Sequence, residues 1–190
     1  MIDNLEGKIL IAPPKMRDYR FAKTVLYCWK HNVGGAAAVI INRPIKSPTF
    51  KEVCRDSGMP PPKNIDAMMW YGGPVGQNMV GLLHSKDMLW TTSNQTTDLA
   101  FTLDRKAIED ITKRQPSQYR VCLGMASWNP GQLEDEVNAV PPRHSFESWL
   151  VCNYDPFIVF NGDKENLWKH AVEKSVKDST RFFTDKIFKK

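Results

Sequence analysis

Three groups of residues in this 190-residue chain are of types that can do chemistry. His84 ends an apolar run, and histidine is the commonest general base because its charge changes near neutral pH. The turn at Gly72 and Gly73 could hold an oxyanion or a phosphate with its backbone N–H groups. Glu134 follows a Trp-Asn-Pro-Gly turn and could exchange a proton with a histidine. His84 and Glu134 are therefore the catalytic candidates.

Each group also has a purely structural explanation. Leu82 and His84 share one face of a predicted strand, which equally suits a half-buried histidine with satisfied hydrogen bonds. The glycine pair lacks the lysine and the spacing of a phosphate loop, so a plain tight turn explains it as well. Acids in the first turn of a helix are favoured by the helix dipole, which accounts for Glu134 and Asp135 without any catalytic role.

The sequence carries no pattern typical of a metal or cofactor site. The acids near residue 134 have neither a His-x-x-x-His pair nor an Asp-x-Asp spacing beside them. The cysteines, none of them in a C-x-x-C motif, are Cys28, Cys54, Cys122 and Cys152. Each has apolar neighbours, which is typical of a small buried hydrophobe, although a reactive thiol stays an alternative. We therefore expect no cofactor and no metal.

Hydrophobic patterning and turn residues predict the elements that must position these groups. Strands are expected at 8–12, 24–30, 35–42, 68–71, 79–84, 119–125, 149–152 and 157–160, with a possible extension at 89–92. Helices are expected at 50–58, 105–114, 130–138 and 165–177. Several strands follow one another directly, which favours an α+β fold over a doubly wound parallel sheet.

Helix-capping residues set the expected starts of three of these helices. Thr49 and Glu52 form a capping box, and Asp104 can cap the helix that follows it. Asn129 is expected to cap the third helix, with Gln132 reaching back toward it. On that helix Gln132 and Glu136 are four residues apart and therefore share one face.

The composition is that of an ordinary globular protein, with 42% hydrophobic and 25% charged residues. The run 36–41 is far too short for a membrane span, which needs roughly 20 apolar residues, and the acidic start is unlike a signal peptide. We therefore expect a cytoplasmic protein with no membrane partner. The net charge is +5, and most of it lies after residue 163. Such a tail is typically solvated, or it contacts nucleic acid weakly.

Five segments, in this order along the chain, together resemble the AlgH/YqgE-like family of bacterial proteins: Leu5–Ala12, the 31–44 stretch that ends in Ile-Asn-Arg-Pro, Tyr71–Val75, Leu83–His84 and Trp128–Glu134. The resemblance implies a single compact α+β domain at 1–178, with a bifurcated, barrel-like mixed sheet flanked by helices. A basic tail at 179–190 would follow it. The chain departs from the family at Lys30, where an acid commonly precedes His31, and at Met125–Trp128, where Tyr-Ala-Gly-Trp is common.

The resemblance also implies a function, that of a transcriptional regulator. Its motif positions fall on a groove formed by Asn42, Pro44, Gly72, Gly73, Pro74, Trp128, Gly131 and Gln132, together with His84 and Glu134. We expect a module that binds a small ligand or a protein partner. Direct reading of DNA is not expected, because the sequence has no helix-turn-helix and its basic residues gather in the tail.

The alternative is an enzyme of uncharacterised reaction with a His/Glu acid–base site. It requires His84, the Gly72–Gly73 turn and Glu134 to surround one cleft, because acid–base groups must come within hydrogen-bond reach of a shared substrate.

Overall fold

The structure, a computed structural model, describes residues 4–60, 67–141 and 147–188. Its strands are β1 (Ile9–Ile11), β2 (Val25–Asn32), β3 (Gly35–Ile40), β4 (Pro44–Ile45), β5 (Met69–Tyr71), β6 (Val75–Ser85), β7 (Asn94–Gln95), β8 (Leu99–Thr102), β9 (Tyr119–Trp128) and β10 (Leu150–Cys152). Its helical elements are α1 (Phe50–Asp56), α2 (Arg105–Ile111), α3 (Gln132–Val137), the π-helical turn η2 (Phe157–Asn161) and α4 (Leu167–Phe188).

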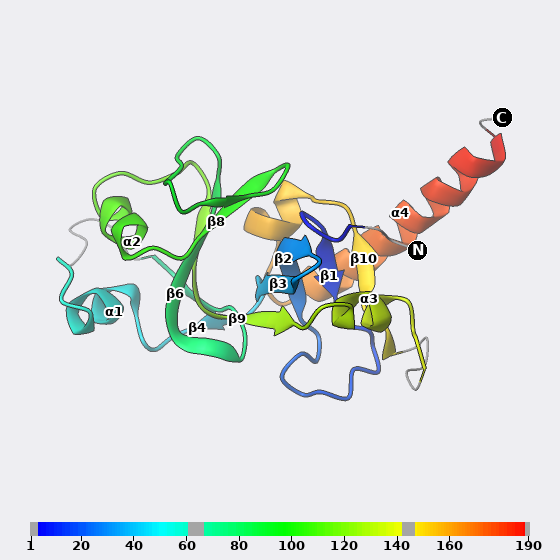
Figure 1. Cartoon of the computed structure of the whole chain (residues 1–190), viewed down its shortest axis with the longest axis horizontal. Helices are drawn as coiled ribbons and strands as arrows, with labels where there is room; N and C mark the ends of the chain where they lie inside the picture. Colours follow the sequence, from blue (N-terminus) through cyan, green and yellow to red (C-terminus); the bar gives the residue numbers. More distant parts are fainter. Residues whose placement is uncertain (1–3, 61–66, 142–146, 189–190) are drawn as a thin grey trace.

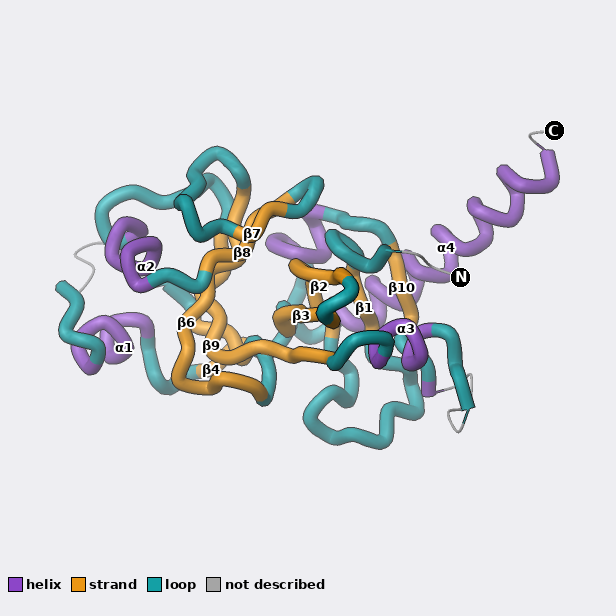
Figure 2. Tube along the Cα trace, viewed as in Figure 1, coloured by secondary structure: helices purple, strands orange, loops and turns teal. Residues whose placement is uncertain are grey.

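The described strands form one mixed, mainly antiparallel sheet in the order β10-β1-β2-β3-β9-β6-β8-β7. Helices lie around it: α1 and α2 beside β6 at one end, and α3 and α4 beside β1, β3 and β10 at the other (Figures 1 and 2). The C-terminal half of α4 projects away from the body (Figure 1). None of the helices in the described ranges has the length and apolar character that a membrane crossing requires.

The sheet branches at β9. The first half of β9 has β6 on one edge and the parallel strand β5 on the other, at Val121–Leu123. In its second half β3 takes the place of β5, pairing at Ala126–Trp128. The residue between the two halves is Gly124, whose φ of 72° requires the left-handed conformation that glycine adopts without strain. The expected bifurcated sheet therefore exists, and β9 is its stem.

The expected α+β class is correct, but the sheet is not a barrel. The strands at the two ends of the hydrogen-bonded order are β10 and β7, and no ladder joins them in the described residues. Among the described residues, side-chain contacts connect β2 to the β7–β8 part of the sheet. Tyr27 and Thr96 share a hydrogen bond of 2.6 Å between their oxygens, and Trp29 stacks on Phe101 with ring centroids 4.6 Å apart.

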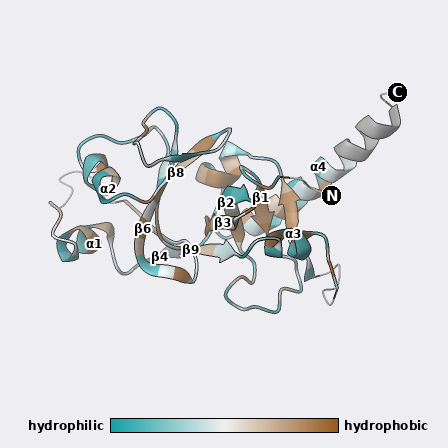
Figure 3. Ribbon diagram, in the orientation of Figure 1, coloured by the Kyte–Doolittle hydropathy of each residue, from teal (hydrophilic) through white to brown (hydrophobic). Residues whose placement is uncertain are grey.

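Apolar residues on both faces of the central strands form the core. Figure 3 shows the hydrophobic colour on the ribbon of β1, one of these strands. In β2, Val25 and Tyr27 face one cluster, which η2 and α4 cover, while Leu26 and Cys28 face another, which α3 covers. A strand buried on both faces is continuously hydrophobic instead of alternating. This explains the unbroken apolar pattern of β3 and of the first five residues of β2.

Two of the three predicted helix starts are confirmed. Thr49 and Glu52 form the full capping box, and the Asp104 side chain accepts from the N–H of Lys106. The prediction for Asn129 is wrong, because α3 begins two residues later and Gly131 is its N-cap residue, at φ 77°. Gln132 does reach back as expected: its Oε1 accepts from the Asn129 N–H at 3.1 Å.

Three other expectations differ from the structure. The segment 157–160 is not a strand but the turn η2, because Asp155 accepts the N–H groups of Phe157 and Ile158 and bends the chain. Residues 89–92 do not extend the sheet, and β7 follows them instead. The helix expected at 165–177 is α4, which continues to Phe188, while residues 189 and 190 lie outside the described part.

Candidate functional site

A pocket of about 360 Å³ opens where β9 ends and α3 begins. We call it the α3 pocket. Five of its lining residues come from this junction and from the segment just before β10: Ser127, Trp128, Gln132, Glu136 and Trp149. The volume falls at the lower end of the range found for small-molecule sites.

The opposite wall comes from two segments far away in the sequence. The loop between β1 and β2, residues 13–24, supplies Met16, Asp18, Arg20 and Phe21. The turn between β5 and β6 supplies Pro74 and Val75. The pocket therefore forms only when the first, middle and last parts of the chain have come together.

Glu136 is the polar centre of the α3 pocket. Its Oε2 atom accepts the indole N–H of Trp128 at 3.0 Å and that of Trp149 at 2.8 Å. Its Oε1 atom accepts from Gln132 Nε2 at 3.0 Å. The residue is 7% exposed, so these charge-assisted hydrogen bonds compensate for burying the carboxylate. They also fix the two rings and the Gln132 amide relative to one another.

Arg43 and Asn42 hold the 13–24 loop in place. The guanidinium of Arg43 donates to the backbone carbonyls of Tyr19, Arg20 and Ala22. Asn42 donates to the carbonyl of Lys23 at 2.8 Å and accepts the N–H of Val25 at 2.9 Å. This pair of motif residues therefore acts on the pocket indirectly, by fixing the loop that forms half of its wall.

Gly72 and Gly73 press the β5–β6 turn against β9, backbone on backbone. A Cβ atom at Gly72 would lie 2.2 Å from the carbonyl oxygen of Gly124, and one at Gly73 would lie 2.3 Å from the carbonyl carbon of Met125. Only glycine permits this approach. The turn is therefore a packing element that places Pro74 at the pocket.

At the mouth of the pocket Asp18 and Arg20 form an ion pair. Arg20 donates from Nε to one carboxylate oxygen at 3.0 Å and from Nη2 to the other at 2.7 Å. The hydrogen bond from Arg20 lowers the pKa of Asp18 below its ordinary value. The carboxylate therefore stays charged at neutral pH.

Of the eight predicted groove residues, Pro74, Trp128 and Gln132 line the α3 pocket. Asn42, Gly72 and Gly73 position its walls, and Gly131 begins the helix that carries Gln132 and Glu136. Pro44 lies farther away, in β4, where it pairs with Trp70.

The structure does not bring His84 and Glu134 together. His84 pairs with Tyr119 at the start of β9, while Glu134 lies beyond the other end of that strand, roughly 30 Å along it. His84 is fully buried and hydrogen-bonded on both ring nitrogens, to the Ser85 carbonyl and to Thr102 Oγ1, each at 2.9 Å. Burial lowers its pKa below the usual value. The structural explanation of His84 fits these contacts.

The partner of Glu134 is His31. The His31 Nε2 atom lies 3.1 Å from Glu134 Oε1, although not aligned as a hydrogen bond, and Nδ1 accepts the N–H of Leu5 at 3.1 Å. Because Nδ1 accepts, the ring proton must be on Nε2, facing the carboxylate. The His31 side chain is 5% exposed. The pair ties the β2–β3 hairpin to α3.

Sequence reasoning also missed Trp149, Phe21 and the buried state of Glu136. The spacing of Gln132 and Glu136 predicted a common face correctly, and both residues do line the pocket. Nothing local in the sequence links Trp149 or Phe21 to that face, because they reach it through long-range strand pairing.

The four cysteines are buried free thiols, as expected for small hydrophobic residues. Burial raises the pKa of Cys28, Cys122 and Cys152 to about 12, so their reactive thiolate forms are scarce at neutral pH. No three His, Cys, Asp or Glu side chains in the described part of the chain are grouped as a metal ion would need.

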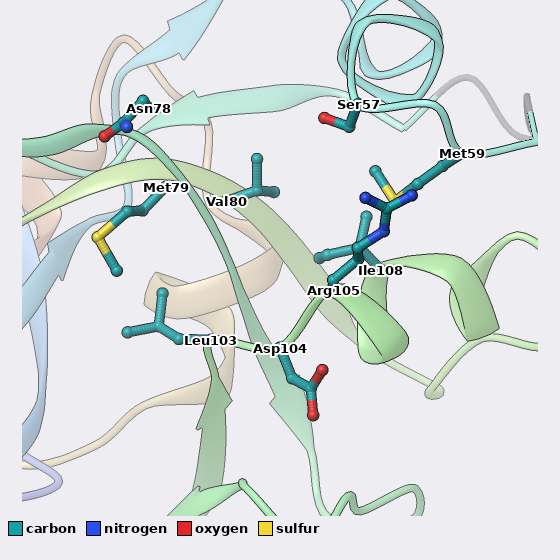
Figure 4. Close-up of a pocket in the computed structure, with 9 residues that line it drawn as sticks. All are labelled: Ser57, Met59, Asn78, Met79, Val80, Leu103, Asp104, Arg105 and Ile108. Carbon is teal, nitrogen blue, oxygen red and sulfur yellow. The ribbon is translucent and has the colours of Figure 1, made fainter.

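A second pocket, of about 280 Å³, lies between β6, α1 and α2 at the other end of the molecule (Figure 4). Its apolar side chains include Met59, Val80, Leu103 and Ile108, and Arg105 stands beside them. None of the predicted groove residues lines it. The sequence motifs therefore single out the α3 pocket.

A family model described as AlgH-like matches residues 9–179 of the chain. The chain belongs to the AlgH-like family. A UPF0301 protein of Photorhabdus laumondii is 32% identical, with 89% of this chain and 90% of the relative covered. A UPF0301 protein of Afipia carboxidovorans is 36% identical, with 90% and 83% covered. The resemblance found in the sequence motifs is therefore confirmed.

Two solved structures share the AlgH-like fold. The solution structure of the AlgH protein from Pseudomonas aeruginosa superimposes with a TM-score of 0.74 at 30% identity, covering 92% of this chain and 90% of that protein. A crystal structure of a protein from Corynebacterium diphtheriae gives a TM-score of 0.63 at 20% identity, covering 88% and 85%, which shows the fold alone.

Proposed function

We propose that this AlgH-like protein is a regulatory module that binds a small molecule in the α3 pocket. The observation that supports this most strongly is convergence. Residues from three segments that stood out in the sequence either line the pocket or fix its walls: Asn42 and Arg43, Gly72–Pro74, and Trp128, Gln132 and Glu136. Separate motifs that meet at one cavity are expected of a binding site more than of a purely structural core.

The chemistry of the pocket supports binding more than catalysis. Glu136 accepts hydrogen bonds from Trp128, Trp149 and Gln132, and Asp18 accepts hydrogen bonds from Arg20. Acid–base catalysis needs a group that can exchange a proton with a substrate. An aromatic, hydrogen-bonded pocket instead has the features that select a ligand by shape and polarity.

An influence on transcription would follow from the bound ligand or from a protein partner, not from reading DNA. The basic residues beyond residue 178 are the part of the chain that we expect to contact nucleic acid. We expect weak binding of duplex DNA that falls steeply with salt, without sequence preference. Replacing Arg181, Lys186, Lys189 and Lys190 by glutamine should abolish it, and sequence-specific binding that survives this change would refute the indirect mechanism.

The ligand-binding proposal is tested by a thermal-shift screen of metabolites and nucleotides. A compound at 100 times its Kd adds about 2.7 kcal/mol of stability. Ser127→Phe places a large side chain at the pocket wall and should abolish the shift of any true ligand. Thr91→Phe is the matched control, because Thr91 is exposed and does not line the pocket.

Stabilisation of wild type and Thr91→Phe, but not of Ser127→Phe, would support the proposal. A library that stabilises none of the three proteins would contradict it and would favour recognition of a protein partner.

A further inference from the structure

The aromatic wall of the α3 pocket has its polar atoms already engaged. The ring of Trp149 stands at 79° to that of Phe21 and at 81° to that of Trp128, with centroids 5.7 and 6.0 Å away. Both indole N–H groups donate to Glu136. These three rings therefore offer a ligand their π surfaces and edges, not an N–H donor.

The hydrogen bonds to Glu136 also affect the electrostatics of the rings. An indole that donates to a carboxylate is polarised, and its face becomes more negative. The negative face of an aromatic ring attracts cations, and tryptophan is the strongest such ring. Two indoles held on one carboxylate therefore favour a positively charged ligand.

The arginine at the mouth does not favour an anion. Arg20 is gripped by both carboxylate oxygens of Asp18, so an anionic ligand would have to compete with Asp18 for it. Its guanidinium carbon already lies 5.9 Å from the centroid of the Phe21 ring. The aromatic wall therefore already accommodates one cationic side chain.

We propose that the α3 pocket binds a small molecule through an alkylated ammonium group, such as a quaternary ammonium. The inference rests on the proposed function and adds the class of ligand to it. Aromatic rings that meet at near-right angles can surround such a cation with their faces and edges. An alkylated ammonium suits this site because its charge is spread over alkyl groups, which are easily removed from water. The alkyl groups also suit Met16 and Pro74 in the same lining.

The test compares choline with 3,3-dimethylbutan-1-ol, which has the same shape but carries a carbon in place of the charged nitrogen. Titration calorimetry on the full chain should show choline binding about 10-fold more tightly than the uncharged isostere. Tetramethylammonium and a trimethyl-lysine peptide complete the panel and separate small metabolites from modified protein segments. Ser127→Phe should abolish binding, and Thr91→Phe should leave it unchanged.

Two further variants test whether the pocket prefers a positively or a negatively charged ligand. Arg20→Gln removes a competing cation and releases Asp18, so choline should bind several-fold more tightly. If the pocket instead binds anions, Arg20→Gln should weaken the binding of its ligand. Phe21→Leu keeps an apolar side chain but removes one ring, and should weaken choline about 5-fold while leaving the uncharged isostere nearly unchanged.

Equal affinity for choline and its isostere, or no binding of any cation in the panel, would overturn the ligand class. If the metabolite screen then yields a neutral or anionic compound whose shift is lost in Ser127→Phe, the proposed function stands and only this inference fails. If neither the panel nor the screen gives a ligand, both fail together.

Discussion

Trp128 and Trp149, from β9 and from the segment before β10, donate their indole N–H groups to the same oxygen atom of Glu136. One buried carboxylate thus connects α3 to two strands that are not neighbours in the sheet. This arrangement gives the α3 pocket a fixed shape in the absence of a ligand, which lowers the entropic cost of binding.

Glu136→Gln tests this connection. The amide replaces one charged acceptor oxygen by an N–H₂ group, so at least one hydrogen bond in the cluster is lost. We expect a loss of about 1–3 kcal/mol in the free energy of unfolding, measured by urea denaturation. Asp135→Asn on the exposed side of the same helix is the control and should cost well under 1 kcal/mol. Equal losses in the two variants would show that the cluster adds no stability.

Arg43→Ala should loosen the 13–24 loop without unfolding the domain. The loop offers trypsin Lys15, Arg17, Arg20 and Lys23, so cleavage there, followed by mass spectrometry, reports its opening. We expect cleavage at least several-fold faster than in wild type, because three loop carbonyls lose their donor. Arg55→Ala, on an exposed part of α1, should leave the cleavage rate unchanged. An unchanged rate in Arg43→Ala as well would refute the holding role.

Gly72→Ala and Gly131→Ala separate close approach from backbone strain. Gly72 has no positive φ, but a Cβ there would collide with the backbone of Gly124. Gly131 has a φ of 77°, yet a Cβ there meets nothing within 4 Å. We expect Gly131→Ala to cost about 1 kcal/mol and Gly72→Ala about 3 kcal/mol or more, measured as shifts in the urea midpoint. The reverse order would contradict the backbone-on-backbone packing.

His84 should make stability fall in acid. Its pKa is lower in the folded protein than in the unfolded chain, because burial disfavours the charged ring. The unfolded chain therefore binds the proton first. Stability is complete above about pH 6.5 and decreases as the pH falls toward the lowered folded pKa. Melting temperatures between about pH 5 and 8 should show this decrease in wild type and a flatter profile in His84→Gln. Parallel profiles would show that His84 does not control this range.

The sequence predicted well what depends on short-range chemistry. The capping box at Thr49 and Glu52, the cap at Asp104 and most strands rest on neighbours within a few residues, and they are confirmed. The strand expected at 157–160 failed because the bend is made by Asp155, just outside the apolar run. The open form of the curled sheet depends on contacts such as that of Tyr27 with Thr96, which no local pattern reveals.

The candidate site was predictable only in part. Trp128, Gln132 and Pro74 belong to motifs that the family resemblance assigns to one groove, and all three line the α3 pocket. The partner of Glu134 was misassigned, because only the sheet pairing shows that His84, in β6, lies at the start of β9, whereas His31, in β2, lies beside Glu134 beyond its end. Phe21 and Trp149 have no sequence signal of their own. They reach the α3 pocket because the strands that follow them, β2 and β10, both pair with β1.

The pairing of β1 with β10, Ile9 opposite Cys152, has a consequence for synthesis of the chain. The first strand to leave the ribosome acquires its outer neighbour only when the last strand has emerged, and Trp149 arrives with that strand. A nascent chain that stops short of residue 149 thus has an uncovered apolar strand edge and no α3 pocket. If the α3 pocket binds a small molecule as we propose, that binding can begin only after most of the domain has been translated.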